Sequence, residues 1–175
     1  MFEEDEIDLS PAARPRVDAP AAKSSPLERL REKLSKKIYR EEFRLEVPER
    51  SKDGSSLQLV ISPNIPQETL KAWKNKAGES SKKGLDFGHF CTLVVASTTV
   101  GMYMDDEEML SEQGHPLTFA SPEIKEMLGV NRPVPEGVRE MFGVDPHVEA
   151  AALTIMEKAG YGEAVDAVDD PLKDS

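Results

Sequence analysis

Cys91-Thr92-Leu93-Val94-Val95-Ala96 is the apolar run that decides the fold of this chain. Apolar residues continue along one broad face on both sides of the run, which predicts a buried central helix from about Leu85 to Met102. After Gly101 comes an acid cluster, Asp105-Asp106-Glu107-Glu108, and then a stop-and-restart signal over residues 114–123. We therefore expect a buried helix, then an acidic segment at residues 105–108, and then a new set of helices.

Three shorter helices are predicted after the acid cluster. Each candidate begins at a proline and stops at a glycine, which is the asymmetry that helix ends prefer. They run from Pro122, capped by Ser121, to Gly129, from Pro135 to Gly143, and from Asp145-Pro146 to Gly160.

A β-hairpin is predicted before the central helix, at about residues 43–61. Residues 43–47 and 57–61 alternate apolar and polar side chains, and Asp53-Gly54 between them is a strong turn signal. A helix from Gln67 to Ala77 follows, with Leu70 and Trp73 facing inward. The expected fold class is mainly α (α+β): a helical domain with one N-terminal β-hairpin.

The N-terminal part of this domain is predicted to be a basic amphipathic helix. Ser25-Pro26 supplies an N-cap and a first-turn proline. Basic residues outnumber acidic ones over residues 27–40, and Tyr39 is the segment's one aromatic residue. A partner-facing or solvated surface is favoured over a nucleic-acid site. The predicted partner-binding residues recur at helical spacing: Leu27, Leu30, Leu34 and Ile38.

The 175-residue length predicts one domain with tails. Residues 1–26 are acidic and rich in proline and alanine, and residues 163–175 are acidic, so both are expected to be disordered tails. Residues 27–162 form the predicted domain. A net charge of −11 argues against general nucleic-acid binding. The single cysteine excludes an intramolecular disulfide, and no apolar run is long enough for a signal peptide or a membrane span.

No residue pattern points to catalysis, a metal or a cofactor. The acids at 105–108 are contiguous, whereas a calcium loop needs alternating ligands, so a solvated turn or charged contact face is favoured. Asp86, His89 and Cys91 invite a metal or nucleophile interpretation, but Cys91 would point to another side of the helix than the other two. The chain contains no phosphate-binding loop, zinc-protease helix or nucleophile elbow. We therefore expect no enzyme activity.

The order of these parts resembles the tail assembly chaperones of long-tailed bacteriophages that infect actinobacteria. The resemblance covers roughly residues 27–162. The matching segments are Leu27-Glu28-Arg29-Leu30 before a hairpin, Leu70-Lys71-Ala72-Trp73, Val100-Gly101-Met102 before the acid cluster, Gly114-His115-Pro116-Leu117-Thr118-Phe119, and the alanine-rich helix before an acidic tail.

This resemblance implies a non-enzymatic helper in the host cytoplasm that coats the tape measure protein during tail assembly. The major tail protein is a second expected partner, and self-association stays open. Such chaperones are often made in two lengths by a −1 ribosomal frameshift, and Asp170-Pro171-Leu172 is compatible with a slippery heptamer. The alternatives are a structural virion component, such as a head–tail connector or tube-associated subunit, and a generic acidic interaction protein.

Overall fold

The computed structural model describes residues 24–79 and 84–162 of the chain. The chain divides into two compact units, residues 1–38 and residues 39–175, and each is described by itself. The predicted tails fall outside the described residues except for residues 24–26. Across the described residues the protein is α+β, with six α-helices and one antiparallel sheet of four strands.

In the first unit the structure describes one helix, α1 (Pro26–Ser35). Its N-terminus forms as predicted: Pro26 occupies the first turn, and the Ser25 hydroxyl accepts a hydrogen bond from the Glu28 N–H at 3.1 Å. The helix is shorter than predicted. Lys36 is its C-cap and already has an extended backbone, so the segment that follows leaves the helix.

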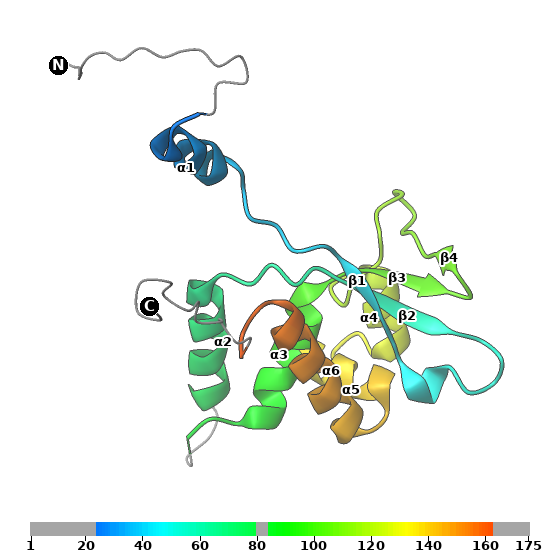
Figure 1. Cartoon of the computed structure of the whole chain (residues 1–175). Coiled ribbons are helices and arrows are strands. Elements are labelled where there is room, and N and C mark those ends of the chain that lie inside the picture. The colour runs from blue at the N-terminus through cyan, green and yellow to red at the C-terminus, as the bar shows by residue number, and fades with distance from the viewer. Residues whose placement is uncertain (1–23, 80–83, 163–175) are drawn as a thin grey trace, which may run out of the picture. The chain divides into compact units, whose positions relative to one another are not determined.

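The second unit is built on a sheet in which the strands follow their order in the chain (Figure 1). Neighbouring strands are antiparallel. The strands are β1 (Phe43–Glu46), β2 (Leu57–Ile61), β3 (Thr99–Met104) and β4 (Glu107–Glu108).

The predicted hairpin is confirmed as β1 and β2, in which Leu45 lies opposite Leu59. Its connection is a long loop rather than a tight turn at Asp53-Gly54. The loop contains the short 3₁₀ helix η1 (Pro48–Arg50) and returns to the sheet at Leu57. The sequence therefore located the two strands correctly but misjudged how they are joined.

The prediction of one N-terminal hairpin in a helical domain was wrong, because two central strands complete the sheet. Helix α3 (Phe87–Thr98) stops earlier than expected, and the chain continues as β3. The hydroxyls of Thr98 and Thr99 donate hydrogen bonds back to the carbonyls of Val94 and Val95, both at 2.7 Å. Threonine and valine at 98–100 stiffen the side-chain torsions and favour a strand. Pairing with β2 then fixes that strand.

The acid cluster forms the β3–β4 hairpin. Met104 pairs with Glu107, so Asp105 and Asp106 are the two central residues of the turn. Both have positive φ, 51° and 67°, as a tight primed turn requires. All four acids are exposed. The predicted solvated turn is therefore observed.

Replacing Asp106 with glycine is expected to stabilise the fold by about 0.5–1 kcal/mol, because glycine adopts positive φ without steric cost. The change removes an ion pair with Arg44 (3.3 Å), but the Asp106 side chain is 86% exposed and such pairs contribute little. Urea denaturation measures the effect. Asp105→Gly is the contrasting variant. Asp105 Oδ1 accepts a hydrogen bond from the Ser56 N–H at 2.7 Å, so the loss of this bond should offset the stabilisation that glycine gives. A less stable Asp106→Gly variant would contradict this account.

In the described part of the second unit five α-helices accompany the sheet, and α3 is their centre. It packs against α2, α5 and α6, and α4 packs against α5 (Figure 1). The helices other than α3 agree with prediction to within a few residues. They are α2 (Gln67–Glu79), α4 (Pro122–Leu128), α5 (Val134–Phe142) and α6 (Asp145–Lys158).

The core lies between the sheet and these helices. On β2, Leu57, Leu59 and Ile61 are buried while the residues between them are half-buried, so one face of the sheet contributes to the core. The residues of the predicted apolar run from Cys91 to Val95 are all buried, as expected. Other fully buried side chains come from β3, α5 and α6: Met102, Val138, Phe142 and Ile155.

Candidate interaction surface

The predicted partner-binding leucines are exposed on helix α1. Leu27, Leu30 and Leu34 are spaced by three and four residues, which places them on one side of the helix. Their exposed fractions are 66%, 48% and 75%, and no residue of α1 is buried. We call these three leucines the α1 apolar face.

Ile38 does not belong to this face. The helix ends at Ser35, so the spacing of four residues between Leu34 and Ile38 no longer brings the two side chains together. Ile38 is 93% exposed in the segment after the helix. The predicted four-residue stripe is thus three leucines on a helix and one isoleucine beyond it.

Basic residues alternate with the leucines of the α1 apolar face along the chain. Residues 29, 31 and 33 are arginine or lysine within the helix, and Lys36 and Lys37 follow it. Cations near a helix C-terminus interact favourably with its dipole. A ten-residue helix is nevertheless marginal in water without tertiary or partner contacts. Exposed leucines on so short a helix suit a segment that buries them in a complex.

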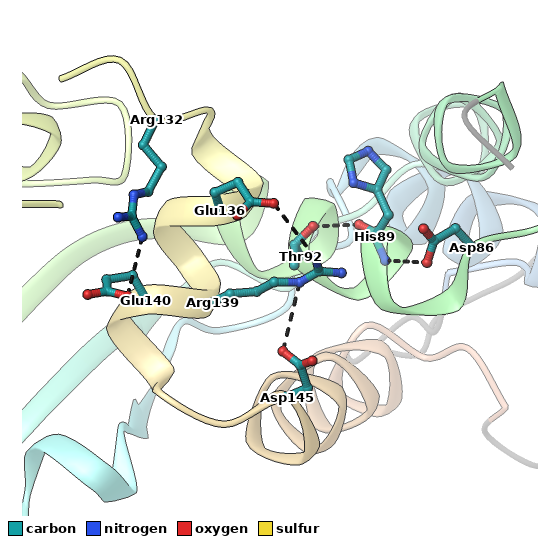
Figure 2. Close-up of polar contacts among 8 residues, drawn as sticks. All are labelled: Asp86, His89, Thr92, Arg132, Glu136, Arg139, Glu140 and Asp145. Carbon is teal, nitrogen blue, oxygen red and sulfur yellow. Dashed lines mark hydrogen bonds and ion pairs between the residues drawn. The ribbon is translucent and has the colours of Figure 1, made fainter. Parts of the chain in front are cut away.

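The polar residues drawn in Figure 2 form a helix cap and ion pairs within and between helices. Asp86 is the N-cap of α3, and its carboxylate accepts the backbone N–H of His89 at 3.0 Å, not a proton of the imidazole. Arg139 of α5 lies 3.8 Å from Asp145 of α6 and 3.9 Å from Glu136. The Asp86 and His89 pair is therefore a helix cap.

A small polar hollow lies beside Arg139. Its volume is about 30 Å³, room for no more than a water molecule or two. A methyl group at Gly88 would approach Arg139 Nη2 to 3.1 Å, so the glycine lets the guanidinium approach α3 closely. The hollow is lined by Gly88, Arg139, Asp145, Val148 and Glu149.

Cys91 is fully buried and unsuited to nucleophilic chemistry. Its burial, with a smaller contribution from the negative charge of Glu149, raises the pKa of its thiol to about 11 from an ordinary 9.0. A thiol is reactive only as the thiolate. Within the described residues no three histidine, cysteine, aspartate or glutamate side chains are grouped to hold a metal ion.

We expect native Cys91 to react with a disulfide reagent at least about a hundredfold more slowly than the unfolded chain, since a pKa two units higher lowers the thiolate fraction by that factor. The same shift makes stability depend on pH. Below pH 9 both states keep the proton, and between pH 9 and 11 the unfolded state loses it first. The free energy of unfolding should then fall by on the order of 1 kcal/mol.

Cys91→Ala is the control, because it removes the thiol and leaves every other ionisable side chain in place. Urea denaturation of both proteins, at pH 8.5 and again between pH 9 and 11, measures the difference in the free energy of unfolding. An equal decline in both proteins would contradict the assignment to Cys91.

Sequence reasoning missed two arginines that link distant parts of the second unit. Arg44 of β1 stacks on the Tyr103 ring, 3.7 Å from its centre, and bonds Asp106. Arg50 of η1 donates to the carbonyls of Glu140 and Met141 at the end of α5. No local sequence pattern predicts either contact, since each joins residues more than fifty positions apart in the chain.

No helix among the described residues is long and apolar enough to cross a membrane. No protein-family model matches the chain, and no curated protein or solved structure is significantly similar to it.

Proposed function

We propose that this chain is a non-enzymatic chaperone of phage tail assembly that binds the tape measure protein. The observation that supports the proposal is the α1 apolar face, a capped helix whose three leucines are exposed. An amphipathic helix of this kind binds by laying its apolar side against a partner's apolar surface. The tape measure protein is expected from the resemblance to be long and rich in helices, and it would offer such surfaces repeatedly along its length.

The test is co-expression of the full chain with the tape measure protein from the same genome, followed by affinity capture. Changing Leu27, Leu30 and Leu34 together to alanine keeps helix propensity but removes apolar area. Each buried leucine contributes about 1.5–3 kcal/mol, so we expect the affinity to fall by about a hundredfold or more. Thermal stability should stay unchanged, because none of the three is buried.

The matched control removes a comparable amount of exposed apolar surface from the second unit. Met127, Val130 and Leu153 are 73%, 70% and 58% exposed, and their joint change to alanine should leave capture intact. Equal loss in both triple variants, or unchanged capture by the α1 variant, would contradict the role given to α1. Failure of the unaltered chain to bind the tape measure protein would contradict the proposed function itself.

The second candidate is a structural virion component. Mass spectrometry of purified particles separates the two functions, since an assembly chaperone is absent from the finished tail. Stoichiometric presence in mature particles would reject the chaperone. The 3′ nucleotide sequence of the gene provides a further test. A slippery heptamer at Asp170-Pro171-Leu172, followed by an overlapping −1 frame, would support the chaperone function.

A further inference from the structure

Strand β1 is an edge of the described sheet, and some of its backbone hydrogen-bonding groups have no partner in the part of the chain that the structure describes. The Val47 N–H donates to the Leu57 carbonyl at 2.9 Å, in register with the β1–β2 pairs. Because an antiparallel ladder uses every second residue toward one neighbour, Leu45 also directs its N–H and C=O toward β2. Arg44 and Glu46 therefore direct theirs away from β2, and β1 has no second neighbour among the described strands.

We propose that a second copy of this chain pairs antiparallel with β1, through its own β1, about a two-fold axis at Leu45. Arg44 then lies opposite Glu46 of the second copy, and Glu46 opposite Arg44 of the second copy. Each pair can exchange two backbone hydrogen bonds, and the sheet continues through both molecules. Such an interface is isologous and closed, as most homodimers are.

Charge complementarity selects this register. The outward-facing residues must lie opposite one another, which restricts the axis to a few positions. An axis at Arg44 places two arginines together, and an axis at Glu46 places two glutamates together. Like charges directly opposite are destabilising, whereas opposite charges stabilise a strand pair. An axis at Phe43 would place Arg44 opposite Glu42, which lies before the strand. Among pairings that join two residues of β1, the axis at Leu45 both satisfies the backbone and pairs opposite charges.

The apolar face of β1 supports the same register. Phe43 and Leu45 pack against the core but are only half-buried, because the sheet stops beside them. In the proposed pair Leu45 lies opposite Leu45 of the second copy, and Phe43 lies opposite Val47. The association would therefore cover apolar surface that the single chain leaves partly exposed.

Arg44 and Glu46 differ in how many contacts their side chains make within the single chain. Arg44 bonds Gln58 and Asp106, each at 3.3 Å, and stacks on Tyr103, so its pairing with a second copy competes with these contacts. Glu46 is exposed and has no ion pair with the described part of the chain. Glu46 is thus the residue at which association can be changed with least effect on the fold.

Sedimentation velocity of the full chain over a concentration series tests the proposal, and we expect a reversible dimer. Glu46→Lys places like charges at both ends of the pair and should raise the dimer dissociation constant roughly tenfold or more. Glu46→Pro removes an outward N–H while leaving the bonds to β2, so it should have at least as large an effect. Adding Arg44→Glu to Glu46→Lys restores opposite charges and should restore the dimer.

Glu126→Lys is the matched control, since Glu126 is an exposed acid on α4 and its reversal changes the net charge equally. It should leave the dissociation constant unchanged. A chain that stays monomeric at every concentration overturns the proposal, and so does a dimer that survives Glu46→Pro. The inference does not rest on the proposed function: the α1 leucine variant should dimerise normally, so the two can fail separately.

Discussion

Phe142→Ala should lower the free energy of unfolding by about 3–5 kcal/mol, the largest effect that we expect from a single substitution in this chain. Phe142 is the last residue of α5 and is 1% exposed. Its helix packs against α3, α4, α6 and η1, so the ring lies where most of the second unit converges. A cavity of phenyl size there cannot collapse without moving several helices.

Urea denaturation followed by circular dichroism measures this loss, with an unchanged slope indicating that the same surface is exposed on unfolding. Met127→Ala is the control, because Met127 is a large apolar residue on α4 that is 73% exposed. That change should shift the free energy of unfolding by about 0.5 kcal/mol or less. If the two variants lost similar stability, Phe142 would not be at the centre of the core.

Arg50→Met should lower the free energy of unfolding by about 2–3 kcal/mol, because it removes two charge-assisted hydrogen bonds. Arg50 Nε lies 3.0 Å from the Met141 carbonyl and Nη2 lies 2.6 Å from the Glu140 carbonyl. These carbonyls belong to the last turn of α5, where helix geometry leaves them without partners and the dipole favours a cation. Methionine keeps most of the side-chain volume but offers no donor.

Lys52→Met is the matched control in the same loop. Lys52 pairs with Glu49 at 2.9 Å, but its side chain is 65% exposed, so the pair should contribute little. Arg50→Lys is the diagnostic second variant, since a lysine keeps the charge but lacks the planar fork that reaches two carbonyls. We expect it to recover only part of the loss. Full stability in Arg50→Met would show that the capping bonds are dispensable.

Local signals predicted most of the helices. Proline at the start and glycine at the end mark α4 and α5, and both Gly129 and Gly143 have positive φ at the C-caps. The cap at Ser25 also formed as the sequence indicates. These signals work because capping depends on residues within one turn of the helix end.

The errors concern elements whose conformation depends on distant partners. Met102 falls at helical spacing on the apolar face, so periodicity alone extended the predicted helix through residues 99–102. Pairing of Leu59 with Met102 makes the same residues a strand, and that pairing joins positions more than forty apart in the chain. The Asp53-Gly54 signal similarly suggested a tight turn, whereas the actual tight turn lies at Asp105-Asp106. For the candidate site, the sequence found the three leucines of α1 but extended their stripe to Ile38.

By itself the sequence determined where most helices begin and where α4 and α5 end, which residues are apolar enough for the core, and that α1 carries leucines on one side. Those properties follow from short-range sterics, capping and hydrophobic periodicity. Only the tertiary structure decided that a strand of the sheet directly follows the helix of the apolar run, that Arg44 and Arg50 link distant segments, and that β1 is an edge of the described sheet. Each of these features depends on hydrogen bonds and contacts between residues far apart in the chain. A local sequence pattern does not specify which distant residue a given residue contacts.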